Sequence, residues 1–323
     1  MKSIYTAAAA LLLGLGASES ALGSCGSAFC MVNTSWDTHG AWADPGWRLD
    51  LRYESIRQNR LQEGRRRASI GEIPRDHDEV ETVNDNWLAG LDYTFNPDWG
   101  VNVSLPIVRR RHSHLQNDPD TGARTPDSWN FSSLGDTRVL ARYRVGTYEY
   151  QGQKLGTLGL NFGVKLATGR FDVQNADGER AERPLQPGSG TTDALLGGYY
   201  AQVLPLKDLS WFAQGLLQAP LDSRDGFKPG RRLSLDAGVR YDATESASLL
   251  LQINALTKSR DSGINAEPVD SGGRSVHLSP GFSIAATRDV RIYAFLQAPL
   301  YQYVNGVQLA ARWVTVLGVS ARF

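Results

Sequence analysis

The stretch that decides the fold is VQLAARWVTVLGVSARF, residues 307–323. Alternate side chains of a β-strand point to opposite faces, and here one parity is mostly apolar whereas the other is mostly small or charged. An outer-membrane β-barrel ends on such a strand, because its last strand pairs with its first and leaves no open edge in lipid. We therefore expect an all-β fold, an antiparallel transmembrane barrel. The apolar parity comprises Leu309, Ala311, Trp313, Thr315, Leu317, Val319, Ala321 and Phe323, and the other parity includes Arg312, Gly318, Ser320 and Arg322.

Composition restricts the class of protein. The 323 residues include 34 Lys and Arg against 34 Asp and Glu, a formal net charge of +0. A nucleic-acid binder would normally carry a basic excess, so we expect no nucleic-acid partner. A mean hydropathy of -0.33 is too polar for a helical membrane protein but suits a barrel with a polar lumen and polar loops.

The N-terminal residues 1–23 have the features of a secretory signal peptide. Lys2 supplies the positive charge, residues 7–17 form a short apolar core, and residues 21–23 offer a cleavage site. The apolar run is too short for a transmembrane anchor, which is the alternative. We expect an exported protein in which residues 24–46 form a periplasmic lead-in and residues 47–323 form the barrel.

Two cysteines, Cys25 and Cys30, follow the signal segment directly. Export places them in an oxidising compartment, so they are candidates for a small disulfide loop. Two alternatives remain open. Residues 22–25 resemble a loose lipidation motif that would consume Cys25, and Met31 beside Cys30 could add a thioether ligand to a copper site.

Alternation along the chain predicts about twelve strands, with ten or fourteen as alternatives. Connections after odd strands are mostly long and those after even strands mostly short, which places both termini in the periplasm. A secreted β-sandwich or jelly roll also alternates and is the soluble alternative. The expected strands are residues 47–58, 83–95, 100–112, 134–145, 155–168, 191–204, 209–220, 232–242, 247–258, 274–286, 290–301 and 307–323.

The inward parity of these strands is strongly charged. Such groups must pair or stay hydrated, so they predict either a wet, charge-lined pore or an ion-pair network that plugs the barrel. Phe212, Leu216, Tyr293 and Phe295 share this parity and form either an apolar ledge or local packing clusters. The expected lumen residues are Arg48, Asp50, Arg52, Glu54, Asp92, Asp136, Arg138, Arg142, Arg144, Lys165, Asp236, Arg240, Asp242 and Arg312.

The outer rim carries two further clusters. Arg109 and Arg111 have outward parity and are candidates for contact with lipopolysaccharide phosphates, because guanidinium groups bind phosphate in bidentate fashion. The alternative is a solvated loop base. A metal site near Asp76, Asp78 and Glu79 is conceivable, but we expect the nearby histidines to lie in solvated loops and predict no metal. These histidines are His77, His112 and His114.

Catalysis has little support in the sequence. His277 and Ser279 share one face of a strand, but no Gly-x-Ser-x-Gly elbow frames a serine. We predict no catalytic residue and no cofactor, with an outer-membrane hydrolase as a remote alternative.

Three motifs resemble one family. They are SLGD at residues 133–136 with LARYR at 140–144, GVKLATG at 163–169, and LQPGSGTTD at 185–193. Together they are similar to the outer-membrane barrels labelled phenol-degradation meta-pathway transporters, over residues 134–323. Ala167 stands where that family usually has proline. The resemblance implies an outer-membrane barrel that transports hydrophobic or aromatic small molecules.

From these features we predict a cell outer-membrane barrel that lets a small aromatic or anionic molecule pass through a charge-lined lumen. Its other partners would be outer-membrane lipid and lipopolysaccharide. The alternative is a non-conducting barrel that acts through its loops or its N-terminal segment.

Overall fold

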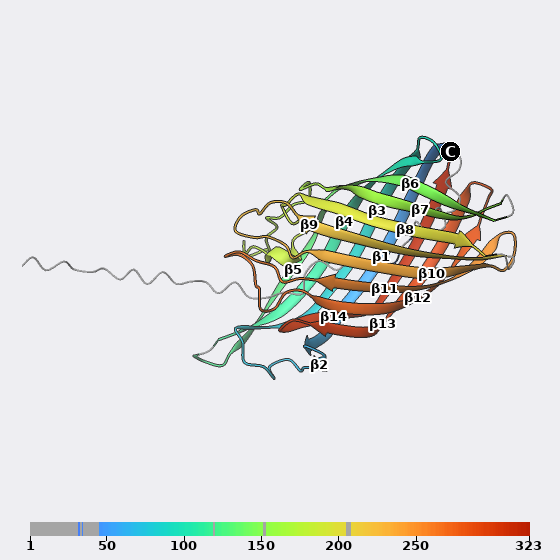
Figure 1. Cartoon of the computed structure of the whole chain (residues 1–323). Helices are drawn as coiled ribbons and strands as arrows, with labels where there is room; N and C mark the ends of the chain where they lie inside the picture. The colour runs from blue at the N-terminus through green and yellow to red at the C-terminus, as the bar shows by residue number, and fades with distance from the viewer. Residues whose placement is uncertain (1–31, 33, 35–44, 119, 151–152, 205–207) are drawn as a thin grey trace, which may run out of the picture.

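The computed structural model describes Val32, Thr34 and residues 45–118, 120–150, 153–204 and 208–323. Over this part the chain forms an antiparallel sheet of 14 strands. Two of them are not part of the closed ring: β2 (Arg66–Arg67) pairs with β1, and β5 (Arg124–Leu134) pairs with β4. The remaining twelve close into a barrel because β14 pairs with β1 (Figure 1). No helix of this part is long and apolar enough to cross a membrane.

The barrel strands agree with the expected set in number and order. The limits of β9 and β11 match the prediction, whereas β1, β3 and β4 extend further at their outer ends. The barrel strands are β1 (Gly46–Glu63), β3 (His77–Thr94), β4 (Trp99–Asn117), β6 (Arg138–Tyr150), β7 (Gln153–Lys165), β8 (Asp193–Val203), β9 (Leu209–Pro220), β10 (Arg232–Asp242), β11 (Ala247–Lys258), β12 (Gly273–Ala285), β13 (Val290–Val304) and β14 (Val307–Arg322).

Side chains on the barrel wall divide as lipid and a barrel interior require. Leu235, Val239 and Leu251 point outward and are 51%, 43% and 43% exposed, whereas Asp236 points inward and is 8% exposed. A protein in water would hide these leucines and valines, but a barrel in lipid exposes them to acyl chains. The closed ring and its apolar belt exclude the two-sheet sandwich and place the chain in the outer membrane.

In the closing strand β14 the predicted outward parity holds from Trp313 onward, whereas Leu309, which was predicted to face outward, is 3% exposed and lines the cavity. Trp313 and Leu317 are exposed, but Val314 and Val316 on the inner face are buried and apolar. The β1–β14 register shifts here, from Arg57 opposite Trp313 to Gln58 opposite Ala311. The skipped residue, Arg312, lies in a bulge and is exposed. Its assignment to the lumen was therefore wrong. One extra residue in a strand exchanges the inward and outward positions of the residues that precede it relative to those that follow.

One strand of the wall is interrupted. Strand β4 pairs with β5 over its outer half and with β6 over its inner half, so β5 and β6 are two pieces of one antiparallel neighbour. They are separated at residues 135–137. Among the described residues β5 forms a ladder with β4 only, whereas β6 continues the barrel by pairing with β7. Residues 113–131 were predicted as a loop, because strand ends above the membrane need no apolar face.

The connection that follows β7, residues 166–192, folds into the barrel beside this interruption. We call it the inserted loop. Its short 3-10 helix (Arg183–Leu185) is fully buried. Ala181 and Leu185 pack against Trp129 of β5, and Nε1 of Trp129 donates a hydrogen bond to the carbonyl of Glu179 at 3.1 Å. The inserted loop thus covers the edge of β5 that carries no ladder.

Candidate functional site: a lumen closed by an inserted loop

The lumen encloses a cavity of about 450 Å³ between the inserted loop and the opposite wall. Its lining is mixed. Seven of the predicted lumen residues contribute polar surface, and apolar side chains face the same space. The predicted residues are Arg48, Asp50, Arg52, Asp92, Asp136, Arg138 and Lys165, and the apolar ones include Ile56, Pro187, Phe227, Leu256, Leu309 and Val314.

The charges of the wall are paired mainly with near neighbours. Nη2 of Arg48 lies 3.3 Å from Oδ2 of Asp92 on the adjacent strand, and Nε of Arg52 lies 2.9 Å from Oε1 of the fully buried Glu54. Asp50 accepts a hydrogen bond from the Tyr293 hydroxyl at 2.9 Å. These contacts hold the charged groups against the wall, so they line the cavity instead of bridging it.

The other predicted lumen residues lie outside the cavity. Arg142 is buried beside Gly100, where a larger residue would meet its guanidinium. Arg144 pairs with Asp98 in the short turn after β3, at 2.8 Å. Two further contacts involve β10. Asp236 accepts from Asn254 at 2.8 Å, and Arg240 pairs with Asp242 at 2.5 Å. Arg138, which does line the cavity, donates to Gln218 at 2.9 Å.

Asp136 is the residue that fixes the inserted loop. It lies in the gap between β5 and β6, and its Oδ2 is 2.7 Å from Nζ of Lys165. The same carboxylate accepts hydrogen bonds from the backbone nitrogen and the hydroxyl of Ser189, at 2.9 and 3.0 Å. Lys165 also donates to the Thr191 carbonyl at 2.7 Å and lies 3.4 Å from Asp193. Both members of the central pair are nearly buried, so each depends on the other.

Three glycines allow the loop to approach this point. A Cβ on Gly169 would lie 2.7 Å from the carbonyl carbon of Gly135 and 2.8 Å from Cα of Gly188. Distances this short are closer than carbon atoms can pack. The backbone of the inserted loop therefore lies directly on the backbone of the interruption, where only glycine fits.

These residues belong to the three motifs that carry the family resemblance. SLGD supplies Gly135 and Asp136, and GVKLATG supplies Lys165 and Gly169. LQPGSGTTD supplies the residues of the inserted loop that contact them, Gly188, Ser189 and Thr191. The sequence identified Asp136 and Lys165 only by strand parity. Ser189 and Thr191 were missed as site residues, although the clustering of Gly, Ser and Thr near charged residues in the motif was a usable signal.

An apolar cluster occupies another part of the lumen. Phe212, Tyr293 and Phe295 belong to it, and Val32 of the N-terminal lead-in packs against them. Thr34 accepts a hydrogen bond from Nη1 of Arg52 at 2.7 Å. The described part of the lead-in therefore lies inside the barrel, deeper than its mouth. The signal segment, Cys25 and Cys30 lie outside the described residues, so the disulfide, lipid and copper hypotheses stay predictions.

The two outward arginines occupy the outer surface above the apolar belt. Arg109 and Arg111 are exposed, and Nη2 of Arg111 lies 3.4 Å from Oδ2 of Asp85. Their neighbour Arg110 points inward, is 1% exposed and donates to Asn84 and to the carbonyl of Leu185 in the inserted loop. The alternation predicted for this run is thus present, and lipopolysaccharide contact stays a prediction.

The rim histidines were expected in solvated loops, and this was wrong. His77, His112 and His114 lie on the outer ends of β3 and β4, point inward and are 1%, 2% and 5% exposed. Burial, together with neighbouring charges, lowers the pKa of His77 and of His114 to about 4. Burial also lowers the pKa of His112.

His277 and Ser279 do not form a nucleophile–base pair among the described contacts. The Ser279 hydroxyl donates to Oδ1 of Asn254 at 2.7 Å and accepts from Gln297 at 3.2 Å. Both of its hydrogen-bonding roles are used in the barrel interior.

This architecture defines the class of protein: an outer-membrane β-barrel whose lumen is narrowed by its own loop. Comparison of the sequence with models of protein families finds no match, and no curated protein matches it.

A solved outer-membrane channel shares the fold. An outer-membrane channel from Pseudomonas putida F1 superimposes with a TM-score of 0.63 at 11% identity, covering 86% of this chain and 96% of that one. The toluene transporter of Ralstonia pickettii gives a TM-score of 0.43 at 9% identity, over 87% and 90% of the two chains. The translocator domain of an autotransporter from Neisseria meningitidis gives 0.45 at 11% identity, over 89% and 93%.

Proposed function

We propose that this barrel passes a small amphipathic molecule, an aromatic ring with one polar or anionic group, across the outer membrane. The observation that carries the proposal is the mixed lining of the cavity. Arg52 and Arg138 contribute charged surface to the lining, whereas Ile56 and Phe227 contribute apolar surface. A cavity of about 450 Å³ lies in the range of small-molecule sites.

The lining decides between solute classes. A purely apolar solute would displace water from the polar groups of the lining and replace none of its hydrogen bonds. A strongly hydrated sugar would gain nothing from the apolar surface. A phenol or a benzoate satisfies both parts of the lining, which agrees with the motif resemblance to phenol-pathway transporters.

The inserted loop and the apolar cluster support a second candidate function, a closed scaffold that does not conduct. Both fill parts of the lumen, and Val32 of the lead-in packs inside the barrel. We propose that the inserted loop is the barrier that sets the rate of passage, so a conducting barrel and a closed scaffold differ in how far this loop moves.

Solute flux into liposomes tests the proposal. Purified barrel in vesicles should admit benzoate and phenol faster than protein-free vesicles do, and faster than arabinose. Ser104→Trp should lower the flux because its indole fills the cavity, which Ser104 lines. Ser132→Trp makes the same change at an exposed position of β5 and serves as the matched control. Equal flux with and without protein for every solute would favour the closed scaffold.

A further inference from the structure

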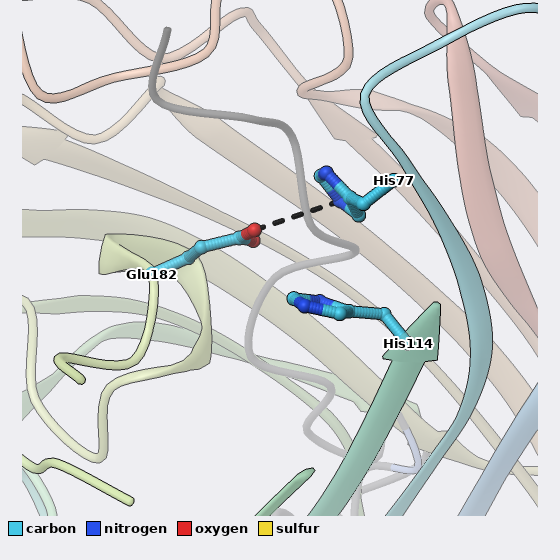
Figure 2. A group of neighbouring side chains, drawn as sticks. All are labelled: His77, His114 and Glu182. Atoms are coloured by element: carbon cyan, nitrogen blue, oxygen red, sulfur yellow. Dashed lines mark ion pairs between the residues drawn. The ribbon is translucent and has the colours of Figure 1, made fainter. Parts of the chain in front are cut away.

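Two histidines of the wall and one glutamate of the inserted loop converge above the apolar belt. His77 comes from β3, His114 from β4 and Glu182 from the residue before the 3-10 helix (Figure 2). Each offers one ligand atom, and these atoms all lie within 4.8 Å of one another. Nε2 of His77 is 3.6 Å from Oε1 of Glu182. In a tetrahedral zinc site, metal–ligand bonds near 2.0–2.2 Å put ligand atoms about 3.4 Å apart.

Both histidine rings are buried, but several of their ring nitrogens lack a hydrogen-bond partner. Among the described residues, Nε2 of His77 and Nδ1 of His114 have no partner within hydrogen-bond distance, and Nε2 of His114 has only a long contact, 3.7 Å, to Oδ2 of Asp127. Most buried polar side-chain atoms in proteins have such a partner, so an unsatisfied set gathered at one point indicates a missing ligand. The two rings lie face to face at a tilt, 4.7 Å between centroids, and Trp129 closes the side next to His114 at 4.9 Å.

The surroundings favour a cation. Oε1 of Glu79 lies 3.5 Å from Nε2 of His77, and its Oε2 lies 3.5 Å from Nε2 of His112. Arg75, a cation that acts on His77, is paired with Asp270 at 2.7 Å. Neutral imidazole and carboxylate are the ligand types that first-row divalent transition metals take, and two His with one Glu is a known zinc set.

We propose that His77, His114 and Glu182 form a site for a divalent transition metal of the Zn²⁺ class, with Glu79 as the candidate fourth ligand. The sequence predicted no metal here, because Glu182 is about 70 to 105 residues from the histidines and only the fold unites them.

The site joins the barrel wall to the inserted loop, and separation of the two would open the lumen. His77 and His114 belong to the barrel wall, whereas Glu182 belongs to the inserted loop. Bound metal would therefore hold the loop in the barrel, and this regulatory consequence rests on the proposed function. Metal binding itself does not.

Cobalt titration of the full, folded barrel tests the site. The protein is purified without a polyhistidine tag, and Co²⁺ is the probe because tetrahedral Co²⁺ absorbs visible light strongly. We expect one equivalent of Co²⁺ to bind with this absorption and Zn²⁺ to displace it. His114→Ala and Glu182→Gln should each weaken binding by more than the roughly 10–100-fold loss typical of changes outside the ligand shell.

Two variants serve as matched controls. Glu179→Gln alters an exposed glutamate of the same loop, and His277→Ala removes another buried histidine far from the cluster in sequence. Both should bind Co²⁺ like the wild type. Heat-modifiable migration on gels confirms that each variant is a folded barrel.

The outcomes distinguish metal binding from its proposed effect on solute flux. No Co²⁺ absorption in the wild type, or unchanged affinity in folded Glu182→Gln, overturns the metal site. If Zn²⁺ binds as expected and lowers benzoate flux in wild type but not in Glu182→Gln, the proposal that bound metal holds the inserted loop in place is supported. If Zn²⁺ binds as expected while flux is present and unaffected, the metal site stands and this regulatory proposal is overturned. A protein that shows no flux at all but binds metal contradicts the proposed function alone.

Discussion

The wall from β9 to β14 and the wall from β3 to β8 follow the same alternation but solve different problems. From β9 to β14 each strand pairs with the next, and the inner face combines the apolar cluster around Phe212 and Phe295 with buried hydrogen bonds around Asn254. From β3 to β8 the wall is interrupted at residues 135–137, and the inserted loop occupies the space beside it. We infer that the first wall contributes more to stability and that the inserted loop beside the second wall is the element that moves.

The difference teaches where stability and function separate in this barrel. Apolar packing is non-directional and tolerates small shifts, so the continuous wall is held by many weak contacts. The interrupted wall depends on a few buried polar contacts, centred on the pair between Asp136 and Lys165. Loss of one such contact leaves a buried charge unpaired, which makes the inserted loop sensitive to single substitutions.

The largest effect is expected in the continuous wall. Phe212→Ala should lower the free energy of unfolding by about 4 kcal/mol, because it opens a cavity beneath a nearly inaccessible ring. Urea unfolding of the reconstituted barrel measures this. Protease resistance of the inserted loop should stay at the wild-type level, and a cleaved loop in the folded variant would show that the two walls are not independent.

A smaller loss of stability, but a larger change in the loop, is expected for Asp136→Asn. The substitution removes the closer of the two carboxylates that balance the buried Lys165 and should cost about 3 kcal/mol in unfolding free energy. Limited proteolysis should now cut within residues 170–182. Asp98→Asn removes the carboxylate of an exposed pair with Arg144 and should cost less than about 1 kcal/mol. Equal resistance to protease in both variants would refute the role of Asp136.

Backbone contact at the interruption should yield a moderate effect. Gly169→Ala places a Cβ against the backbone of Gly135 and Gly188 and should cost about 2 kcal/mol through overpacking. Gly146→Ala, where no atom lies within 4 Å, is the control and should leave stability unchanged or slightly raised. A Gly169→Ala barrel as stable as the control would mean that the loop can shift without cost.

The smallest effect concerns the outer surface. Removing both guanidinium groups in Arg109→Ala/Arg111→Ala should weaken binding to lipopolysaccharide micelles by about fivefold at low salt and less at high salt, since exposed charges are screened. Arg322→Ala at the opposite end of the barrel is the control. Unchanged binding at low salt would assign the two arginines to solvent contact only.

Predictability follows the same division of the molecule. Residues 209–220 and 247–258 were predicted with the limits that β9 and β11 have, because each lipid-facing side chain alternates with an inward one. Strand β5 was missed because it rises above the apolar belt, where polar residues suit both faces. The position of Arg312 was predicted wrongly because the alternation of side chains in the sequence does not reveal a β-bulge.

The candidate site was predictable only in part. Arg48, Asp92 and Lys165 follow from strand parity alone and line the cavity. The contacts of Asp136 with Ser189 and of Leu185 with Arg110 depend on a loop that folds back across the barrel, and alternation carries no information about such a path. His77 and His114 looked like loop residues for the same reason, since their burial is created by the inserted loop.

Single-channel recording in planar bilayers tests the central claim most directly, namely that the inserted loop is the barrier and Asp136 holds it. Wild type and Asp98→Asn should show small, brief conductance steps, whereas Asp136→Asn should show larger and longer openings. Identical conductance in all three proteins would contradict the account.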